Sequence, residues 1–102
     1  MKPFLLSPAA AQDLAEIVAY IASERPSAVK GVLDALEAAC QLVAEYPGVG
    51  RARDEIDDGV MSFPMGTYVL FYHANEDPVG IARILHGSRD LGSVFRKTSV
   101  EE

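Results

Sequence analysis

Hydrophobic positions in the first half of the chain recur with the period of an amphipathic helix. Residues 8–24 carry apolar side chains three and four positions apart, which predicts a helix over this range. Ser7 and Pro8 favour a helix start, because the serine oxygen accepts from unpaired amides and proline lacks a donor that would need a partner. The same periodicity predicts a second helix from Val29 to Tyr46. The break "ERPSA" (24–28) is short, so the two helices are expected to form an antiparallel hairpin.

The second half of the chain changes to the short, β-branched and aromatic-rich segments of a sheet. Strands are predicted at "KPFLLS" (2–7), "GVMSFP" (59–64), "TYVLFYH" (67–73) and "VGIARILH" (79–86). Turn residues separate the last three segments, which favours an antiparallel meander. The expected fold is therefore α+β, in the order β-α-α-β-β-β, with the helical hairpin packed on one face of a small antiparallel sheet.

The central predicted strand is apolar on both faces. Alternation places Tyr68, Leu70 and Tyr72 on one face and Val69, Phe71 and His73 on the other. One helical layer covers only one face, so another element must cover the second. The segment "LGSVF" (91–95), a second copy and a different chain are the alternatives. We favour a different chain, because a bare Phe71 or Tyr72 would promote aggregation.

Composition indicates one globular domain. We expect residues 1–95 to form it and the C-terminal tail 96–102, which lacks apolar periodicity, to be flexible. Apolar runs fall far short of the roughly 20 residues that cross a bilayer, so no membrane partner is expected. The single cysteine, Cys40, excludes an internal disulfide and is typical of a reducing cytoplasm. At a core position of the second helix it is expected to be a buried small hydrophobe.

Charge narrows the choice of partner. The chain has 15 acidic and 9 basic residues, a net charge of −6, and lysine only at Lys2, Lys30 and Lys97. Because phosphate contacts supply most of the affinity for nucleic acid, strong direct nucleic-acid binding is not expected. A basic protein surface is the easier match. The sequence has no metal-ligand spacing and no phosphate-binding glycine loop, so no metal or cofactor is expected.

The stretch "RILHGSRDL" (83–91) concentrates the candidate chemistry. His86 is either a general acid or a strand-end histidine bonded to the backbone. Alternation places Arg83 on one apolar strand face with Ile81 and Leu85, so it either pairs with an acid of the loop 54–58 or emerges toward a partner. Arg89 and Asp90 form either a weak surface pair or a device that orients the C-terminal segment.

The loop "RARDEIDD" (51–58) precedes the second predicted strand. It is either a solvated loop or, through Arg51 and Arg53, a local cationic spot. Cleavage of RNA by attack of its 2′-hydroxyl needs a base, an acid and positive groups. The residues available for such a set are His86, His73, Tyr72, Arg83 and Arg51.

Four segments together resemble the RelE/ParE superfamily of bacterial toxins, and the ParE branch within it. They are "SPAAAQDLAEIVAYIA" (7–22), "YPGVGRARDEI" (46–56), "SFPMGTYVLFYH" (62–73) and "IARILHGSRDL" (81–91), and the resemblance extends from about Phe4 to Phe95. It implies the toxin of a type II toxin–antitoxin system, neutralised by a small ParD-like antitoxin in a hetero-oligomer. ParE-like members poison DNA gyrase and block replication, whereas RelE-like members are ribosome-dependent mRNA endonucleases.

The residues favour the ParE branch within this resemblance. The RNA-cleaving branch presents several lysines and arginines on an open sheet face, and this chain has no lysine between Lys30 and Lys97. We therefore expect a cytoplasmic, binding-type gyrase poison rather than an enzyme; a ribonuclease and a non-toxic antitoxin-binding relative are the alternatives.

The resemblance implies no defined catalytic set, so none is assigned. A ribonuclease would use His86, Arg83 and Arg51. The residues expected to contact a partner or target are Arg51, Tyr72, Arg83, His86, Arg89, Asp90 and Phe95.

Overall fold

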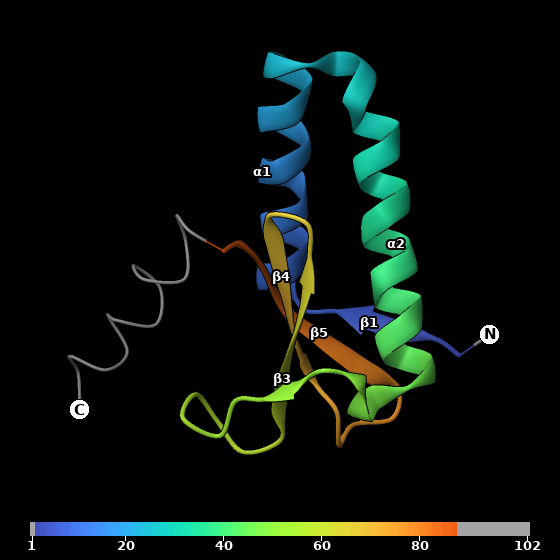
Figure 1. The fold of residues 1–102 in the computed structure, drawn as a ribbon, viewed down its shortest axis with the longest axis vertical. Coiled ribbons are helices and arrows are strands. Elements are labelled where there is room, and N and C mark those ends of the chain that lie inside the picture. The colour runs from blue at the N-terminus through green and yellow to red at the C-terminus, as the bar shows by residue number, and fades with distance from the viewer. Residues whose placement is uncertain (1, 88–102) are drawn as a thin grey trace.

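The computed structural model describes residues 2–87, which form two helices packed on a five-stranded sheet (Figure 1). The helices are α1 (Pro8–Glu24) and α2 (Val29–Glu45), with one 3₁₀ turn before α2 and one after it, at Pro26–Ala28 and Pro47–Val49. The strands are β1 (Phe4–Leu6), β2 (Arg51–Ala52), β3 (Val60–Met65), β4 (Tyr68–His73) and β5 (Val79–His86). The predicted α+β class is confirmed, and α1 and α2 lie side by side as a hairpin (Figure 1).

The sheet is mixed, which corrects the prediction of an antiparallel sheet. Its order is β1-β5-β4-β3-β2, and the β3-β4-β5 meander is antiparallel as expected. β1 instead pairs with β5 in parallel, from Phe4 opposite Val79 to Leu6 opposite Ile81. The helical hairpin carries the chain away from β1, so β1 and the last strand can run in the same direction at one side of the sheet. β2 was not predicted, because two residues are too few to show a period.

The start of α1 forms as the sequence predicts. The Ser7 Oγ accepts a hydrogen bond from the Ala10 amide at 2.9 Å, and Pro8 occupies the first helical position. The same hydroxyl donates to the Ala82 carbonyl oxygen at 2.8 Å. Ser7 therefore caps α1 and joins it to β5.

The main core lies between the helices and the sheet. Tyr68, Leu70 and Tyr72 contribute to it from β4, on the face that alternation assigned to them. Ile17 in α1 and Val43 in α2 pack against them. Burial of these helix stripes against the sheet supplies the main stabilisation of the fold.

The opposite face of the sheet carries a second, smaller cluster. Val60, Phe71 and Leu85 are buried there, with Ile56 and Val69 packed against them. Phe71 is only 2% exposed and Tyr72 is fully buried, so the expectation that either would lie bare without a partner chain is wrong. Ile56 reaches this cluster from the loop after β2, whose Arg53 amide bonds back to the Val60 carbonyl oxygen.

Three predictions concern residues that the structure does not describe. Cover from the segment 91–95, a domain boundary at residue 95 and a flexible tail at 96–102 all lie outside the described residues. Within residues 2–87, no helix combines the length and the hydropathy needed to cross a membrane.

The Tyr72 hydroxyl joins β4 to the turn after α2. It donates to the Pro47 carbonyl oxygen at 2.7 Å and accepts from the Gly50 amide at 3.0 Å. Burial raises the pKa of this phenol, against the opposing effect of the hydrogen bond from Gly50. A Cβ added at Gly50 would lie 2.5 Å from the Ser62 carbonyl oxygen and from the Tyr72 hydroxyl, so only glycine fits.

We predict that Tyr72→Phe lowers the free energy of unfolding by about 1–2 kcal/mol, because two partners of the hydroxyl lose a hydrogen bond. Urea denaturation measures this change. The control is Tyr46→Phe, whose side chain is 62% exposed and should change stability by less than about 0.5 kcal/mol. Equal effects of the two substitutions would contradict the structural importance of the Tyr72 hydroxyl.

Candidate functional site

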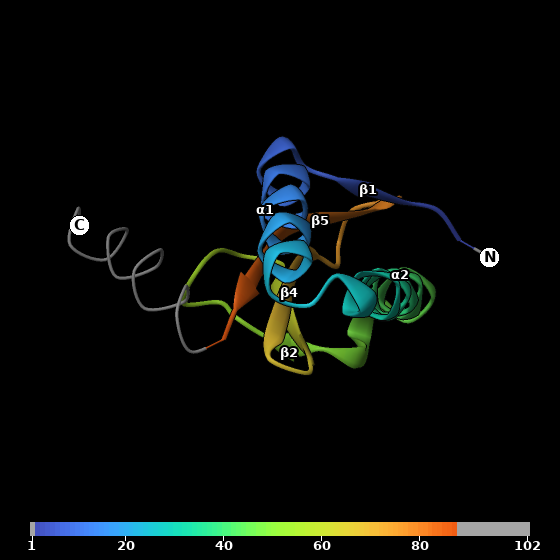
Figure 2. The same ribbon diagram turned by 90° about the horizontal axis from the view of Figure 1, so that it is seen from above.

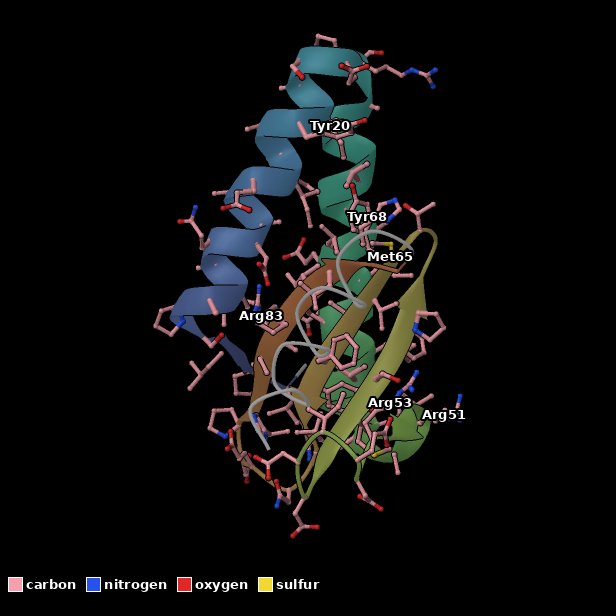
Figure 3. All side chains as sticks on the ribbon, turned by 90° about the vertical axis from the view of Figure 1, so that its left-hand side faces the viewer. Tyr20, Arg51, Arg53, Met65, Tyr68 and Arg83 are labelled. Carbon is pink, nitrogen blue, oxygen red and sulfur yellow. The ribbon has the colours of Figure 1, made fainter. Side chains whose placement is uncertain are left out.

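Arg83 of β5 forms a bidentate ion pair with Asp13 of α1. Its Nε and Nη2 donate to the two carboxylate oxygens of Asp13 at 2.8 and 2.9 Å. Asp13 Oδ2 also accepts from the Ile84 backbone amide at 3.0 Å. Asp13 is 8% exposed, so its charge is buried and is compensated by three hydrogen bonds. Figure 3 shows Arg83 beside α1.

Asp13 occupies the position that a longer β1 would fill. The pairing of β1 with β5 ends at Ile81, whose carbonyl oxygen accepts from the Ser7 amide at 3.0 Å. Further along β5, polar groups of Ser7 and Asp13 satisfy the backbone of Ala82 and Ile84. The beginning of α1 thus replaces a strand as the hydrogen-bonding partner of the second half of β5.

A β-bulge in β5 sets the direction of Arg83. Tyr72 pairs with Ile81 and Phe71 with Arg83, so Ala82 is the additional residue. As a result Ile81 and Ile84 both lie in the main core, whereas Arg83 and Leu85 belong to the opposite face. The prediction that Ile81 shares a face with Arg83 is wrong, because strict alternation fails at the bulge.

The predicted internal ion pair of Arg83 exists, but its predicted partner is wrong. The acids of the loop 54–58 follow β2, at the far edge of the sheet from β5. Asp13, 70 residues away in sequence, is the partner instead. A signal for it was present, because Asp13 lies three residues after Ala10 and four before Ile17, on the core-facing stripe of α1.

His86 lies on the helix-facing side of the sheet, away from Arg83. It pairs across the strands with Tyr68, and the two rings meet edge-on with centroids 5.6 Å apart. Its other predicted companions are also separated from it. His73 shares the opposite face with Val60, and the Tyr72 hydroxyl is engaged by Pro47 and Gly50.

Arg51 lies on β2, at the opposite lateral edge of the sheet from the strand β5 that carries Arg83 and His86. β2 and β5 are three strand spacings apart, which is ~14 Å at the ~4.8 Å separation of neighbouring strands. The residues named for RNA cleavage are therefore not brought together within residues 2–87. Arg89, Asp90 and Phe95 lie outside the described residues. Tyr72 is fully buried, so its predicted contact with a partner is wrong.

Arg51 and Arg53 form a corner at β2 (Figure 3). The Arg53 Nε donates to the buried Ser62 hydroxyl at 2.8 Å, and its Nη1 lies 3.4 Å from the Glu55 carboxylate. The Arg51 side chain is exposed. The pKa of Glu55 is lowered by a hydrogen bond from its own backbone amide, with Arg53 and Arg51 contributing. Glu55, in the same loop, therefore partly neutralises the positive charge of the predicted cationic spot.

An apolar groove of about 230 Å³ lies between the helices beside β1. Its lining includes Leu14 of α1, Leu33 of α2 and Leu6 of β1, and Cys40 reaches it from α2. Burial raises the pKa of the Cys40 thiol to about 11, with a smaller contribution from the charge of Glu37. This thiol is therefore a poor nucleophile, as the sequence indicated.

Comparison with known proteins identifies the family of this chain. A family model described as the ParE toxin of the type II toxin–antitoxin system, parDE, matches residues 4–91. The chain belongs to the ParE toxin family. It is accordingly a ParE-family toxin of a type II toxin–antitoxin system, as the resemblance implied.

Individual relatives agree with this family. The chain is 35% identical over 91 residues to Toxin ParE1 of Caulobacter vibrioides, covering 86% of this chain and 92% of that protein. Toxin ParE1 of Mycobacterium tuberculosis is 33% identical, with 86% and 92% covered. Toxin RelE3 of Caulobacter vibrioides is 31% identical, with 84% and 95% covered.

A solved structure supports the fold. A chain of the "Chromosomal ParDE TA system from P. aeruginosa" superposes with a TM-score of 0.70, covering 84% of this chain and 96% of that one. The two are 16% identical, so this likeness concerns the fold alone.

We predict that Asp13→Ala lowers the free energy of unfolding by about 2–4 kcal/mol, because it leaves the Arg83 guanidinium and the Ile84 amide without their shared acceptor. The control is Asp34→Ala, which removes an exposed pair with Lys30 and should cost about 0–1 kcal/mol. Chemical denaturation compares the two variants, and a loss at Asp13 no larger than at Asp34 would contradict the structural importance of this pair.

We predict that the Cys40 thiol contributes a pH-dependent stability. Its folded-state pKa of about 11 lies above the ordinary value near 9, so the neutral thiol stabilises the fold below about pH 9 and this contribution is lost as pH rises through 11. The free energy of unfolding of the wild type should therefore fall more steeply between pH 9 and 11 than that of Cys40→Ala. Parallel slopes for the two proteins would argue against a raised pKa.

Proposed function

We propose that this toxin inhibits DNA gyrase by binding to it, without a chemical step of its own, and that a cognate antitoxin holds it inactive. The observation that carries the proposal is the separation of Arg83 and His86 onto opposite faces of the sheet. The family match supports a toxin, and the arrangement of these groups favours one that acts by contact.

The geometry favours binding over cleavage of RNA. General acid–base catalysis needs a base and an acid within about 3 Å of one reacting centre, with positive charge aimed at the same point. Here Asp13 binds two nitrogens of Arg83, the His86 ring rests against Tyr68, and Arg51 lies three strands away. A reaction centre would require these groups to converge.

The net charge of the chain also favours a protein target over RNA. With a net charge of −6, the chain repels the phosphates of RNA over most of its surface. The exposed side chain of Arg51, beside the partly buried Arg53, is suited to an acidic protein patch instead. We place the target contact at this corner together with the end of β5, at His86, and with the predicted contact residues that follow it, Arg89, Asp90 and Phe95.

An antitoxin partner is supported by the family and by the structural neighbour, which was solved from a ParDE system. The neutralising chain is expected to be basic, because this toxin is acidic. Co-expression with a cognate antitoxin should yield a stable complex.

We predict that purified toxin inhibits DNA supercoiling by gyrase at micromolar concentration and increases the amount of cleaved DNA. Preincubation with the antitoxin should abolish both effects. Arg51→Glu should weaken inhibition at least tenfold, because it reverses charge at the proposed contact, whereas Arg25→Glu at the exposed end of α1 should leave it within twofold. Folded, antitoxin-binding toxin without effect on gyrase would overturn the gyrase assignment.

A ribosome-dependent endonuclease is the second candidate, favoured by the 31% identity to Toxin RelE3. It predicts codon-positioned cuts in mRNA during translation in a cell-free extract, lost in His86→Ala and in Arg83→Ala. Because Arg83 also supports the fold, the His86 variant is the sharper test. Such cuts with unaffected gyrase would replace the first proposal by the second.

A further inference from the structure

The turn between α2 and β2 carries two large apolar side chains at the surface. It leads into β2, the edge of the sheet that lies away from β1 (Figure 2). Tyr46 is 62% exposed and Val49 is 45% exposed. The Val49 amide donates to the Tyr46 carbonyl oxygen at 2.9 Å, and a turn closed by such a bond brings its first and fourth Cα atoms within about 7 Å. Arg51 follows, so an aromatic, an aliphatic and a cationic side chain are concentrated between positions 46 and 51.

The backbone of this turn is fixed from inside the protein. The Tyr72 hydroxyl donates to the Pro47 carbonyl oxygen at 2.7 Å and accepts from the Gly50 amide at 3.0 Å. Gly50 lies against β3 and β4, because an added Cβ would be 2.5 Å from the Ser62 carbonyl oxygen and from the Tyr72 hydroxyl. Arg51 then pairs with Ser62 in the sheet. A partner that binds this turn therefore does not have to order its backbone, which lowers the entropic cost of association.

Arg51 gives the turn a charge of opposite sign to that of the chain as a whole. Its side chain is exposed (Figure 3), and within residues 2–87 no carboxylate forms an ion pair with it. The neighbouring Arg53 is engaged by Ser62 and Glu55, and Glu45 precedes the turn at the end of α2. The free positive charge is therefore confined to Arg51, on the β2 side of the turn.

This composition favours the target over the antitoxin as the partner at the turn. Tyrosine and arginine are the side chains that most often dominate the affinity of a protein interface. The antitoxin is expected to be basic, because the toxin has a net charge of −6, and a basic chain is repelled by Arg51. An apolar surface with acidic groups at its rim is the better match to this turn.

We propose that the turn 46–51 is a preformed recognition element for the target of the toxin and is held in shape by Tyr72. Tyr46 and Val49 enter an apolar depression on the target protein, and Arg51 pairs with a carboxylate at its rim. Tyr72 is a positioning residue, because it is buried and acts through the backbone of Pro47 and Gly50. This inference rests on the proposed function, because DNA gyrase is the occupant. It adds an apolar contact and its internal support to the charged contact at Arg51.

The first test measures the affinity of full-length toxin for gyrase in the absence of DNA. Tyr46→Ala and Val49→Asp should each weaken this affinity at least tenfold and leave the affinity for the antitoxin within twofold. The matched control is Tyr20→Ala, which removes a tyrosine that is 51% exposed on α1, toward the other end of the molecule from Arg51 (Figure 3). This variant should bind gyrase within twofold of the wild type.

The second test separates positioning by Tyr72 from its contribution to stability. At a temperature where Tyr72→Phe is fully folded, its Gly50 amide should exchange at least tenfold faster than in the wild type, because the acceptor of that amide is removed. Its affinity for gyrase should fall at least threefold, whereas its affinity for the antitoxin should stay within twofold. Tyr68→Phe is the control in the same strand, since within residues 2–87 the hydrogen bonds to the turn come from Tyr72.

The outcomes separate this inference from the proposed function. Wild-type toxin that binds gyrase while Tyr46→Ala and Val49→Asp bind equally well overturns the recognition turn and leaves the proposed function intact. Equal losses of gyrase and antitoxin binding overturn its selectivity for the target. Normal binding to DNA-free gyrase with loss of cleaved DNA alone would assign the turn to DNA and overturn the protein contact.

The remaining outcomes concern Tyr72 and the target itself. A Tyr72→Phe variant with faster exchange at Gly50 and unchanged affinity for gyrase overturns the positioning role alone. Folded, antitoxin-binding wild-type toxin that does not bind gyrase overturns both proposals.

Discussion

The packing of the helical layer on the sheet depends on the hydrogen bonds that the Asp13 carboxylate accepts from Arg83 and Ile84. β1 pairs with β5 over three residues, so the second half of β5 has no neighbouring strand on that side. A buried strand edge requires hydrogen-bond partners, and Asp13 supplies one to Ile84 while Ser7 supplies another to Ala82. Burying the charge of Asp13 is costly, and the bidentate contact with Arg83 offsets that cost. Because these bonds anchor the first turns of α1 to β5, they also fix one wall of the groove beside β1.

This ion pair changes how Arg83 of β5 is interpreted. An arginine in an apolar strand suggests a functional cation when read from sequence. In the folded chain two of its nitrogens hold a helix, and strand alternation places it on the face opposite His86. Acid–base catalysis on this sheet would require Arg83 and His86 to meet at one reacting centre. Arg83 is thus best understood as part of the framework that joins α1 to the sheet.

Local patterns sufficed for most of the fold. The period of apolar residues predicted α1, and its observed bounds follow from the residues at its ends. Ser7 and Pro8 mark its start, and Pro26 follows its end. Three features depended on distant contacts and could not be predicted this way. The parallel pairing of β1 is set by where the hairpin returns the chain, the bulge by the pairing of β4 with β5, and the partner of Arg83 by packing of α1. The position of Asp13 was still a signal, because it is an acid on the core-facing stripe of a helix. An acid at such a position is a candidate ion-pair partner for an arginine in a buried strand.

The burial of Phe71 removes the reason for expecting a second chain over the open face of the sheet. Apolar residues on both sides of β4 suggested that a second chain must cover the sheet, yet Phe71, Val60 and Leu85 are already buried in the toxin alone. The large apolar side chains that stay exposed are instead spread over β1, the helices and the turn after α2: Leu5, Leu6, Tyr20, Leu33, Tyr46 and Val49. The net charge of −6 disfavours RNA as a ligand and favours a basic partner.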